Sequence, residues 1–154
     1  MMSIFVLGIA SFLPFTDIII TPKAYKGYLG NRHIKFDGYM ENTYLHPKYF
    51  KPNIDCLKKL NISSKEKYVI IRLVSWDASH DIGQKGFTLH ILTNLIEKIK
   101  NHARVFISAE NKIPDSLKQY HLSINPTEIH DILSYASLFI GEGATMASEC
   151  AVMG

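Results

Sequence analysis

Residues 68–74 read YVIIRLV, and this apolar run decides the fold. A stretch that carries only one charge, at Arg72, is typical of a strand that is covered on both faces, as in a parallel sheet. Two further runs follow, RVFIS at residues 104–108 and LFI at residues 138–140. The segments between them have helical spacing or helix-start signals. The alternation of strand and helix predicts an α/β fold with a parallel, Rossmann-like sheet, flanking helices and right-handed crossovers.

The first helix after this strand is predicted over residues 87–102, because its apolar side chains recur at helical spacing and form one stripe. That stripe consists of Leu92, Leu95, Ile96 and Ile99. After the second apolar run, residues 114–120 are expected to form a short helix and residues 121–124 a short strand.

Asn125 and Pro126 mark the start of another helix, since asparagine caps helices and proline suits the first helical position. Glu128 lies where a capping-box partner belongs. The helix is expected to end near Ala136, with Ile129, Ile132 and Leu133 facing inward. A last helix is predicted to reach Met153.

The N-terminal part is less regular. Residues 17–22 (DIIITP) predict a short buried strand that ends at a proline. Residues 23–53 are rich in aromatic side chains, which flexible linkers lack, and are interpreted as a folded connector. A short helix is expected over residues 52–60. No strand follows the last helix and no helix precedes the first strand, so we expect a chain that is truncated at both ends.

Composition limits the classes of function. The chain is 47% hydrophobic and 20% charged, with a formal charge of +3 and a pI near 8.8. These values fit a globular protein that binds an anion, although such an excess is also common on ordinary surfaces. No basic stripe is interleaved with aromatic residues, so a nucleic-acid partner is not expected.

Location is inferred from the cysteines and the N-terminus. Cys56 and Cys150 share no metal-ligand spacing and are far apart in sequence, which favours a reducing cytoplasm. The apolar run at residues 4–15 has the length of a signal peptide, but no base precedes it. Pro14 and Asp17 interrupt it, so no stable membrane span is expected. A buried element is the preferred interpretation, and a secretory signal is the alternative.

A small-residue turn links the strand at 138–140 to the last helix and is the first candidate binding site. Ligands of parallel sheets bind at the carboxyl ends of strands, where helix N-termini offer free N–H groups to phosphates. Thr145 can cap the helix or contact a phosphate, and Glu149, one turn later, can bind ribose hydroxyls. A tight turn with a solvent-facing glutamate is the alternative. The candidate residues are Gly141, Glu142, Gly143, Ala144, Thr145 and Glu149.

Residues 75–86, after the first strand of this sheet, form the second candidate site, because their loop is expected at the same sheet edge. They are dense in side chains that bind ligands or transfer protons. A solvated loop and a metal site are alternatives, but the spacing fits no specific metal. Arg72 belongs with this loop, and its buried guanidinium needs a carboxylate or a substrate as partner. The loop's candidate residues are Ser75, Trp76, Asp77, His80, Asp81 and Lys85.

These segments resemble an uncharacterised prokaryotic domain family of the GT-B glycosyltransferase clan. The resemblance rests on PFTD at residues 14–17, TP at 21–22, GY at 38–39 and YLHP at 44–47. It continues through IR at 71–72, SW at 75–76, HDIGQKG at 80–86 and GEGATM at 141–146 with Glu149. Among proteins whose chemistry is understood, the chain is similar to the non-hydrolysing UDP-N-acetylglucosamine 2-epimerases and to GT-B glycosyltransferases.

This resemblance implies two Rossmann-like domains that face a cleft, with UDP held mainly by the second. Residues 1–66 would be the end of the N-terminal domain and a connector, and residues 67–154 the first half of the nucleotide-binding domain. Gly143, Ala144 and Thr145 match the epimerase turn at the diphosphate, and Glu149 matches its ribose-binding glutamate. Ala144 and Thr145 replace two glycines of that turn.

The leading hypothesis is therefore a fragment of a GT-B-type protein that binds a nucleotide sugar, derived from a glycosyltransferase. The alternatives are a UDP-sugar 2-epimerase-like enzyme and a non-catalytic binding remnant. The loop at 75–86 lacks the His-Arg pair of the epimerases, so no catalytic base is assigned, and the chain alone is expected to be inactive. No cofactor or metal is expected. Exposed sheet edges predict self-association.

Overall fold

The computed structural model describes residues 13–75 and 86–154. The chain divides into two compact units, Met1–Tyr44 and Leu45–Gly154. Each unit is described by itself.

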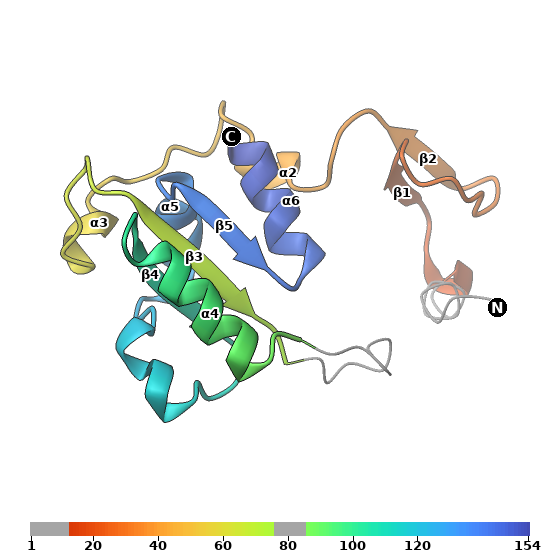
Figure 1. Ribbon diagram of the computed structural model, residues 1–154. Coiled ribbons are helices and arrows are strands. Elements are labelled where there is room, and N and C mark those ends of the chain that lie inside the picture. The colour runs from red at the N-terminus through yellow and green to blue at the C-terminus, as the bar shows by residue number, and fades with distance from the viewer. Residues whose placement is uncertain (1–12, 76–85) are drawn as a thin grey trace. The chain divides into compact units, whose positions relative to one another are not determined.

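The second unit is built on a parallel three-stranded sheet (Figure 1). Its strands are β3 (Tyr68–Leu73), β4 (Arg104–Ala109) and β5 (Leu138–Gly141), in the order β4-β3-β5. Both pairings of β3 are parallel, so β3 is the central strand. The α/β class with a parallel Rossmann-like sheet and flanking helices is confirmed.

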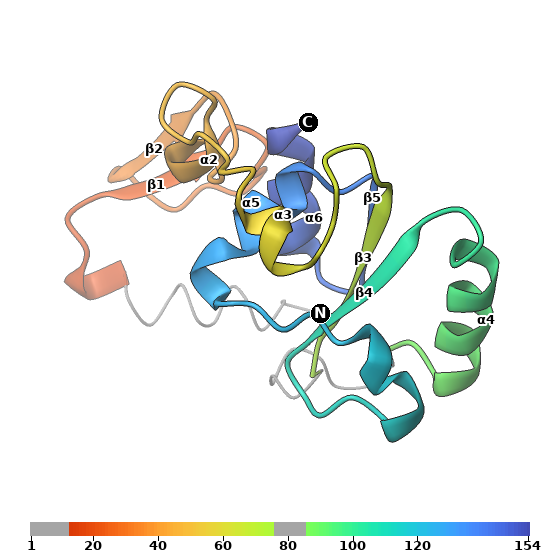
Figure 2. The ribbon, with the colours of Figure 1, turned by 90° about the vertical axis from the view of Figure 1, so that its left-hand side faces the viewer.

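Helices cover both faces of this sheet (Figures 1 and 2). One face carries α4 (Leu89–Ile99), and the other carries α5 (Ile129–Ser134) and α6 (Ala144–Met153) together with the short α3 (Cys56–Lys59). The turn from β5 to α6 is short, whereas a longer connection with two 3₁₀ helices leads from β4 to α5.

The core follows directly from the two-residue period of β3. Tyr68 and Ile70 point into the cluster formed with α3, α5 and α6, whereas Val69 and Ile71 point into the cluster formed with α4. All four side chains are at most 3% exposed. Burial on both faces explains why this strand lacks polar alternation.

Capping residues act as their types predict. The side chain of Thr88 accepts a hydrogen bond from Ile91 N at the start of α4, and Asn125 accepts one from Thr127 N. Asn125 caps a 3₁₀ turn, η3 (Pro126–Glu128), that leads into α5. Glu128 does not complete a capping box, because its carboxylate binds Lys59 instead.

Of the two elements predicted between β4 and α5, the short helix is present and the strand is wrong. Residues 121–124 form no strand and contribute only an isolated bridge between His121 and Ile107. The preceding helix is a 3₁₀ helix, η2 (Asp115–Tyr120), in which Leu117 is buried against the α4 cluster. Leu122, just after η2, is buried in the cluster of Tyr68 and Ile70, so this segment packs two leucines beside β4 rather than adding a strand.

Residues 45–62 belong to the second unit. Asn53 N donates to the Asp131 carboxylate at 2.9 Å, and the Tyr135 hydroxyl donates to Pro52 O at 2.9 Å, so α5 and its C-cap residue hold this segment from two positions. Its apolar side chains, among them Cys56, Leu57, Leu60 and Ile62, belong to the core cluster of Tyr68 and Ile70. Compactness thus divides the chain after Tyr44, while the domain boundary at residue 66 stays a prediction.

The first unit has little regular structure in its described residues. It contains η1 (Leu13–Phe15), β1 (Ile19–Pro22) and β2 (His33–Phe36), with β1 and β2 paired in parallel; α2 (Asn42–Leu45) spans the division between the units. The strand expected at residues 17–22 is therefore present. Its predicted burial is wrong, since Ile18 is 57% and Ile20 59% exposed. The sequence did not predict β2, because four residues are too few to show the alternation of apolar and polar side chains that identifies a strand.

No helix in residues 13–75 or 86–154 is long and apolar enough to cross a membrane. The apolar run at residues 4–15, which raised the question of a signal peptide, lies mostly outside the described residues.

The packing of α4 yields a matched test of the core. Ile96 is 2% exposed against the sheet, whereas Ile91 on the same helix is 48% exposed. Ile96→Ala is expected to lower the free energy of unfolding by about 2–5 kcal/mol, because it leaves a cavity in the core. Ile91→Ala, the control, is expected to change it by roughly 0.5 kcal/mol or less. Urea unfolding measures both; equal effects would contradict the assigned face of α4.

Candidate functional site

The carboxyl ends of the three strands form the candidate site. Because the strands are parallel, their ends lie at one edge of the sheet, where Arg72 on β3 is level with Ser108 on β4 and Gly141 on β5. The β3 exit, the β4 exit and the turn before α6 therefore lie close together. Such an edge is where ligands of Rossmann-like sheets bind.

The N-terminus of α6 is free of side-chain capping. Its N-cap residue is Gly143, which has no side chain to cap the helix, and no side chain of residues 13–75 or 86–154 caps the backbone there. Ala144 and Thr145, the first two helical residues, are both exposed, and Thr145 does not serve as the N-cap. The first turn thus presents N–H groups and the positive end of the helix dipole at the sheet edge.

Gly141 is required by close packing at the end of β5. A Cβ atom there would lie 2.5 Å from the Phe139 ring and 3.5 Å from Cβ of Arg72. A side chain at this position would therefore displace the ring that packs beneath the turn. Gly143 is less restricted, since a Cβ there would only come within 3.4 Å of Val74.

Glu142, between these glycines, holds two separate pieces of backbone. Its Oε2 accepts a hydrogen bond from Val74 N at 3.0 Å, and its Oε1 accepts one from Phe87 N. Val74 follows β3 and Phe87 precedes the N-cap of α4. The carboxylate is therefore fully engaged by backbone donors and connects the head of α6 to two other segments.

The partner of the Arg72 guanidinium is a carboxylate of the chain itself, whereas the sequence left a carboxylate and a substrate as alternatives. Its guanidinium donates to Glu110 Oε1 at 2.8 Å and to Ser108 Oγ at 2.8 Å. The second oxygen of Glu110 accepts from Ser75 N at 3.0 Å. The Ser75 N–H and the Arg72 guanidinium both stabilise the charged carboxylate and lower the pKa of Glu110.

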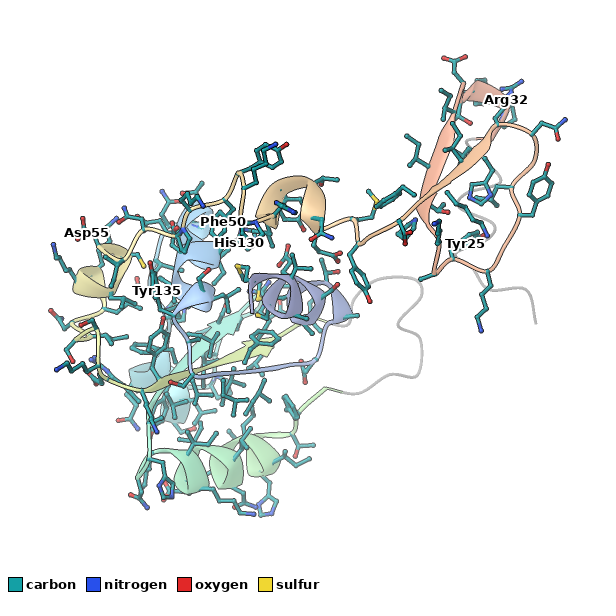
Figure 3. All side chains as sticks on the ribbon, turned by 90° about the horizontal axis from the view of Figure 1, so that it is seen from above. Tyr25, Arg32, Phe50, Asp55, His130 and Tyr135 are labelled. Carbon is teal, nitrogen blue, oxygen red and sulfur yellow. The ribbon has the colours of Figure 1, made fainter. Side chains whose placement is uncertain are left out.

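Glu149 lies within α6 and is buried, with 8% of the residue exposed. Its Oε1 is 3.2 Å from Nε2 of His130 on α5. The His130 ring packs edge to face against Phe50, and the two residues are labelled in Figure 3. The glutamate therefore joins α6 to α5. Burial and the neighbouring Glu149 raise the pKa of Cys150 to about 11, which fits a packing role for this thiol.

Two cavities lined by described residues open at the sheet edge. The cavity on the α6 side measures about 360 Å³ and runs from Arg72 and Ser108 past His121–Ile124 to Met146. The cavity on the α4 side measures about 290 Å³ and is bounded by Glu142, Phe87, Thr88 and Lys112. Arg72 therefore contributes to the first cavity and Glu142 to the second.

Several candidate residues of the β3–α4 loop lie outside the described residues, namely Trp76, Asp77, His80, Asp81 and Lys85. Their predicted roles stay predictions. Ser75 is described, and its backbone N–H is held by Glu110. Within residues 13–75 and 86–154, no group of three histidine, cysteine, aspartate or glutamate side chains is arranged to hold a metal ion.

Ser108, Glu110 and His130 are site residues that sequence reasoning missed. Glu110 follows β4 as Glu142 follows β5, and this shared position after a buried strand was a usable signal. His130 gave no such signal, because its partner Glu149 is 19 positions away on another helix. Its pairing depends on how α5 packs against α6.

Comparison with protein families gives one match. The family model described as "Protein of unknown function (DUF354)" matches residues 10–154. The matched range includes both candidate segments, the β3–α4 loop and the turn before α6. The comparisons with curated proteins and with solved structures find no significant match.

The two partners of Glu110 can be separated by titration. Arg72→Gln is expected to raise the pKa of Glu110, because it removes the guanidinium that stabilises the carboxylate. The pKa is expected to stay below its ordinary value, since the Ser75 N–H, the larger cause, remains. NMR titration of the glutamate carboxyl carbon measures the shift, with Arg104→Gln on the exposed start of β4 as control. An unchanged pKa in Arg72→Gln would contradict the assigned contact.

Proposed function

The chain belongs to the DUF354 family, and from this premise we propose that it binds a nucleotide sugar through its diphosphate at the N-terminus of α6. The proposal includes membership of the GT-B clan, similarity to UDP-N-acetylglucosamine 2-epimerases, and UDP as the nucleotide. Glycosyl transfer is the reaction that we propose such binding serves.

The observation that carries the proposal is the uncapped head of α6 at the carboxyl edge of a parallel sheet. Gly143 leaves the first N–H groups without a side-chain acceptor, and Ala144 and Thr145 are exposed beside them. Phosphate oxygens bind such groups through hydrogen bonds and through the helix dipole. The small side chains at residues 143 and 144 leave room for a phosphate to approach the backbone.

The cavity on the α6 side supports a nucleoside at the adjoining position. Met146, in the first turn of α6, lines this cavity, so the cavity reaches the N-terminal turn of the helix. Its volume of about 360 Å³ lies in the range of small-molecule sites. Apolar side chains such as Ile124 and Ile129 suit the faces of a base, while Arg72, Ser108 and Ser123 offer polar groups for its edge.

Glu149 remains the proposed ribose ligand. It follows Thr145 by one helical turn, so the diphosphate and ribose contacts would come from one side of α6. His130 already occupies one of its oxygens at 3.2 Å. Ribose hydroxyls would bind the Glu149 carboxylate beside His130 or in its place, so the His130 contact would compete with ribose binding.

The proposal is tested by titrating the protein with UDP and UDP-N-acetylglucosamine in a calorimeter. The wild-type chain is expected to bind both. Ala144→Asp places a negative charge at the first helical position, where acidic residues stabilise a helix but repel a phosphate. We expect it to weaken binding by about tenfold or more, as like charges at contact distance require.

Ala151→Asp is the matched control, because it makes the same change at an exposed position near the other end of α6. It is expected to retain wild-type affinity, and circular dichroism checks the folding of both variants. Absence of UDP binding by folded wild-type protein would refute the proposal. Equal affinities of the two variants would place the ligand elsewhere.

A further inference from the structure

Two glutamates hold the chain where it leaves the central strand. Glu110 directly follows β4 and Glu142 directly follows β5, the two neighbours of β3. The carboxylate of Glu142 accepts from Val74 N, and that of Glu110 accepts from the next amide, Ser75 N, both at 3.0 Å. We call Glu110 and Glu142 the glutamate clamp.

The backbone of the same two residues continues the sheet on either side of β3. Glu110 N donates to Leu73 O at 3.3 Å, and Glu142 N donates to Arg72 O at 3.4 Å. Each glutamate thus binds β3 or its exit twice, through its own N–H and through its carboxylate. This arrangement fixes the direction in which the chain leaves β3.

Glu142 has a further contact that Glu110 lacks. Its Oε1 accepts from Phe87 N, the residue before the Thr88 N-cap of α4. One carboxylate therefore joins the exit of β3 and the entry to α4, and its own residue lies directly before the N-cap of α6. The N-termini of the two helices are connected through a single side chain.

The charges of the two glutamates are balanced differently. Glu110 has the Arg72 guanidinium beside it, at 2.8 Å. Glu142 has no cationic partner among the described residues, so backbone N–H groups stabilise its charge. Hydrogen bonds from neutral donors to a charged acceptor are stronger than those between neutral groups. The two hydrogen bonds that the Glu142 carboxylate accepts from backbone N–H groups are therefore strong enough to position the exit of β3 and the entry to α4.

We infer that Glu142 is a positioning residue that couples ligand binding at the head of α6 to the exit of β3 and the N-terminus of α4. This inference rests on the proposed function, because the ligand is the proposed nucleotide. A diphosphate at Gly143–Thr145 would bind next to Glu142. The affinity for the diphosphate therefore depends on where the hydrogen bonds of the carboxylate hold Glu142. By thermodynamic linkage, if the Glu142 hydrogen bonds strengthen nucleotide binding by some factor, bound nucleotide stabilises these hydrogen bonds by the same factor.

The clamp itself is tested without nucleotide, by amide hydrogen exchange in NMR. Glu142→Ala is expected to speed exchange at Val74 and Phe87 by about tenfold or more, the effect of losing one charge-assisted bond. Ser75, which Glu110 holds, should stay slow. Glu110→Ala is the matched control, with faster exchange at Ser75 and no change at Phe87. Unchanged exchange at Val74 and Phe87 in Glu142→Ala would overturn the clamp.

The coupling is tested by titrating UDP into the wild type, Glu142→Ala and Glu142→Gln. Glutamine keeps one acceptor oxygen and loses the charge, so a positioning role predicts weaker binding in both variants, by about tenfold in the alanine variant. A residue that acted only by repelling the phosphate would instead give tighter binding in both. Urea unfolding checks that the variants are folded, and the exposed Glu97→Gln on α4 is expected to bind as the wild type does.

The outcomes separate this inference from the proposed function. If the wild type binds UDP but both Glu142 variants bind equally well or more tightly, the coupling is wrong while nucleotide binding stands. If the wild type does not bind UDP, the proposed function fails and the coupling fails with it. The exchange measurement then still decides whether Glu142 holds the two segments.

Discussion

The structure of the second unit depends on the burial of β3 on both faces. Tyr68 and Ile70 on one face and Val69 and Ile71 on the other are almost completely removed from water. Burial of four large side chains from one short strand requires a strand at each edge and helices above and below. The parallel neighbours β4 and β5, and the helices that cover them, meet this requirement.

The carboxyl edge of this sheet then gathers a particular set of charges. Arg72 and Glu110 neutralise each other across β3 and β4, while Glu142 is engaged by backbone amides of two segments. Among the described residues, no side chain caps the N-terminus of α6 at this edge. The anion binding that we propose at α6 and the positioning role that we infer for Glu142 both depend on one short turn, Gly141–Gly143.

Much of this arrangement could be predicted from local sequence. The runs at residues 68–74, 104–108 and 138–140 identified the three strands, and Asn125 identified the cap before α5. The short strand expected at residues 121–124 was wrong, because four mixed residues do not distinguish a strand from an extended connection. Ile18 to Ile20 suggested burial, but apolar composition alone does not supply a covering element, and Ile20 is largely exposed.

The sequence by itself determined the α/β class, the parallel sheet and the position of the glycine-rich turn, because these depend on apolar period and on glycine, which are local properties. Only the tertiary structure decided the partners of the charged side chains. Arg72 binds Glu110 across 38 positions of sequence, Glu142 binds Val74 and Phe87, and Glu149 meets His130 on another helix. A buried charge must find a partner, but which residue lies within reach is set by strand register and helix packing rather than by sequence spacing.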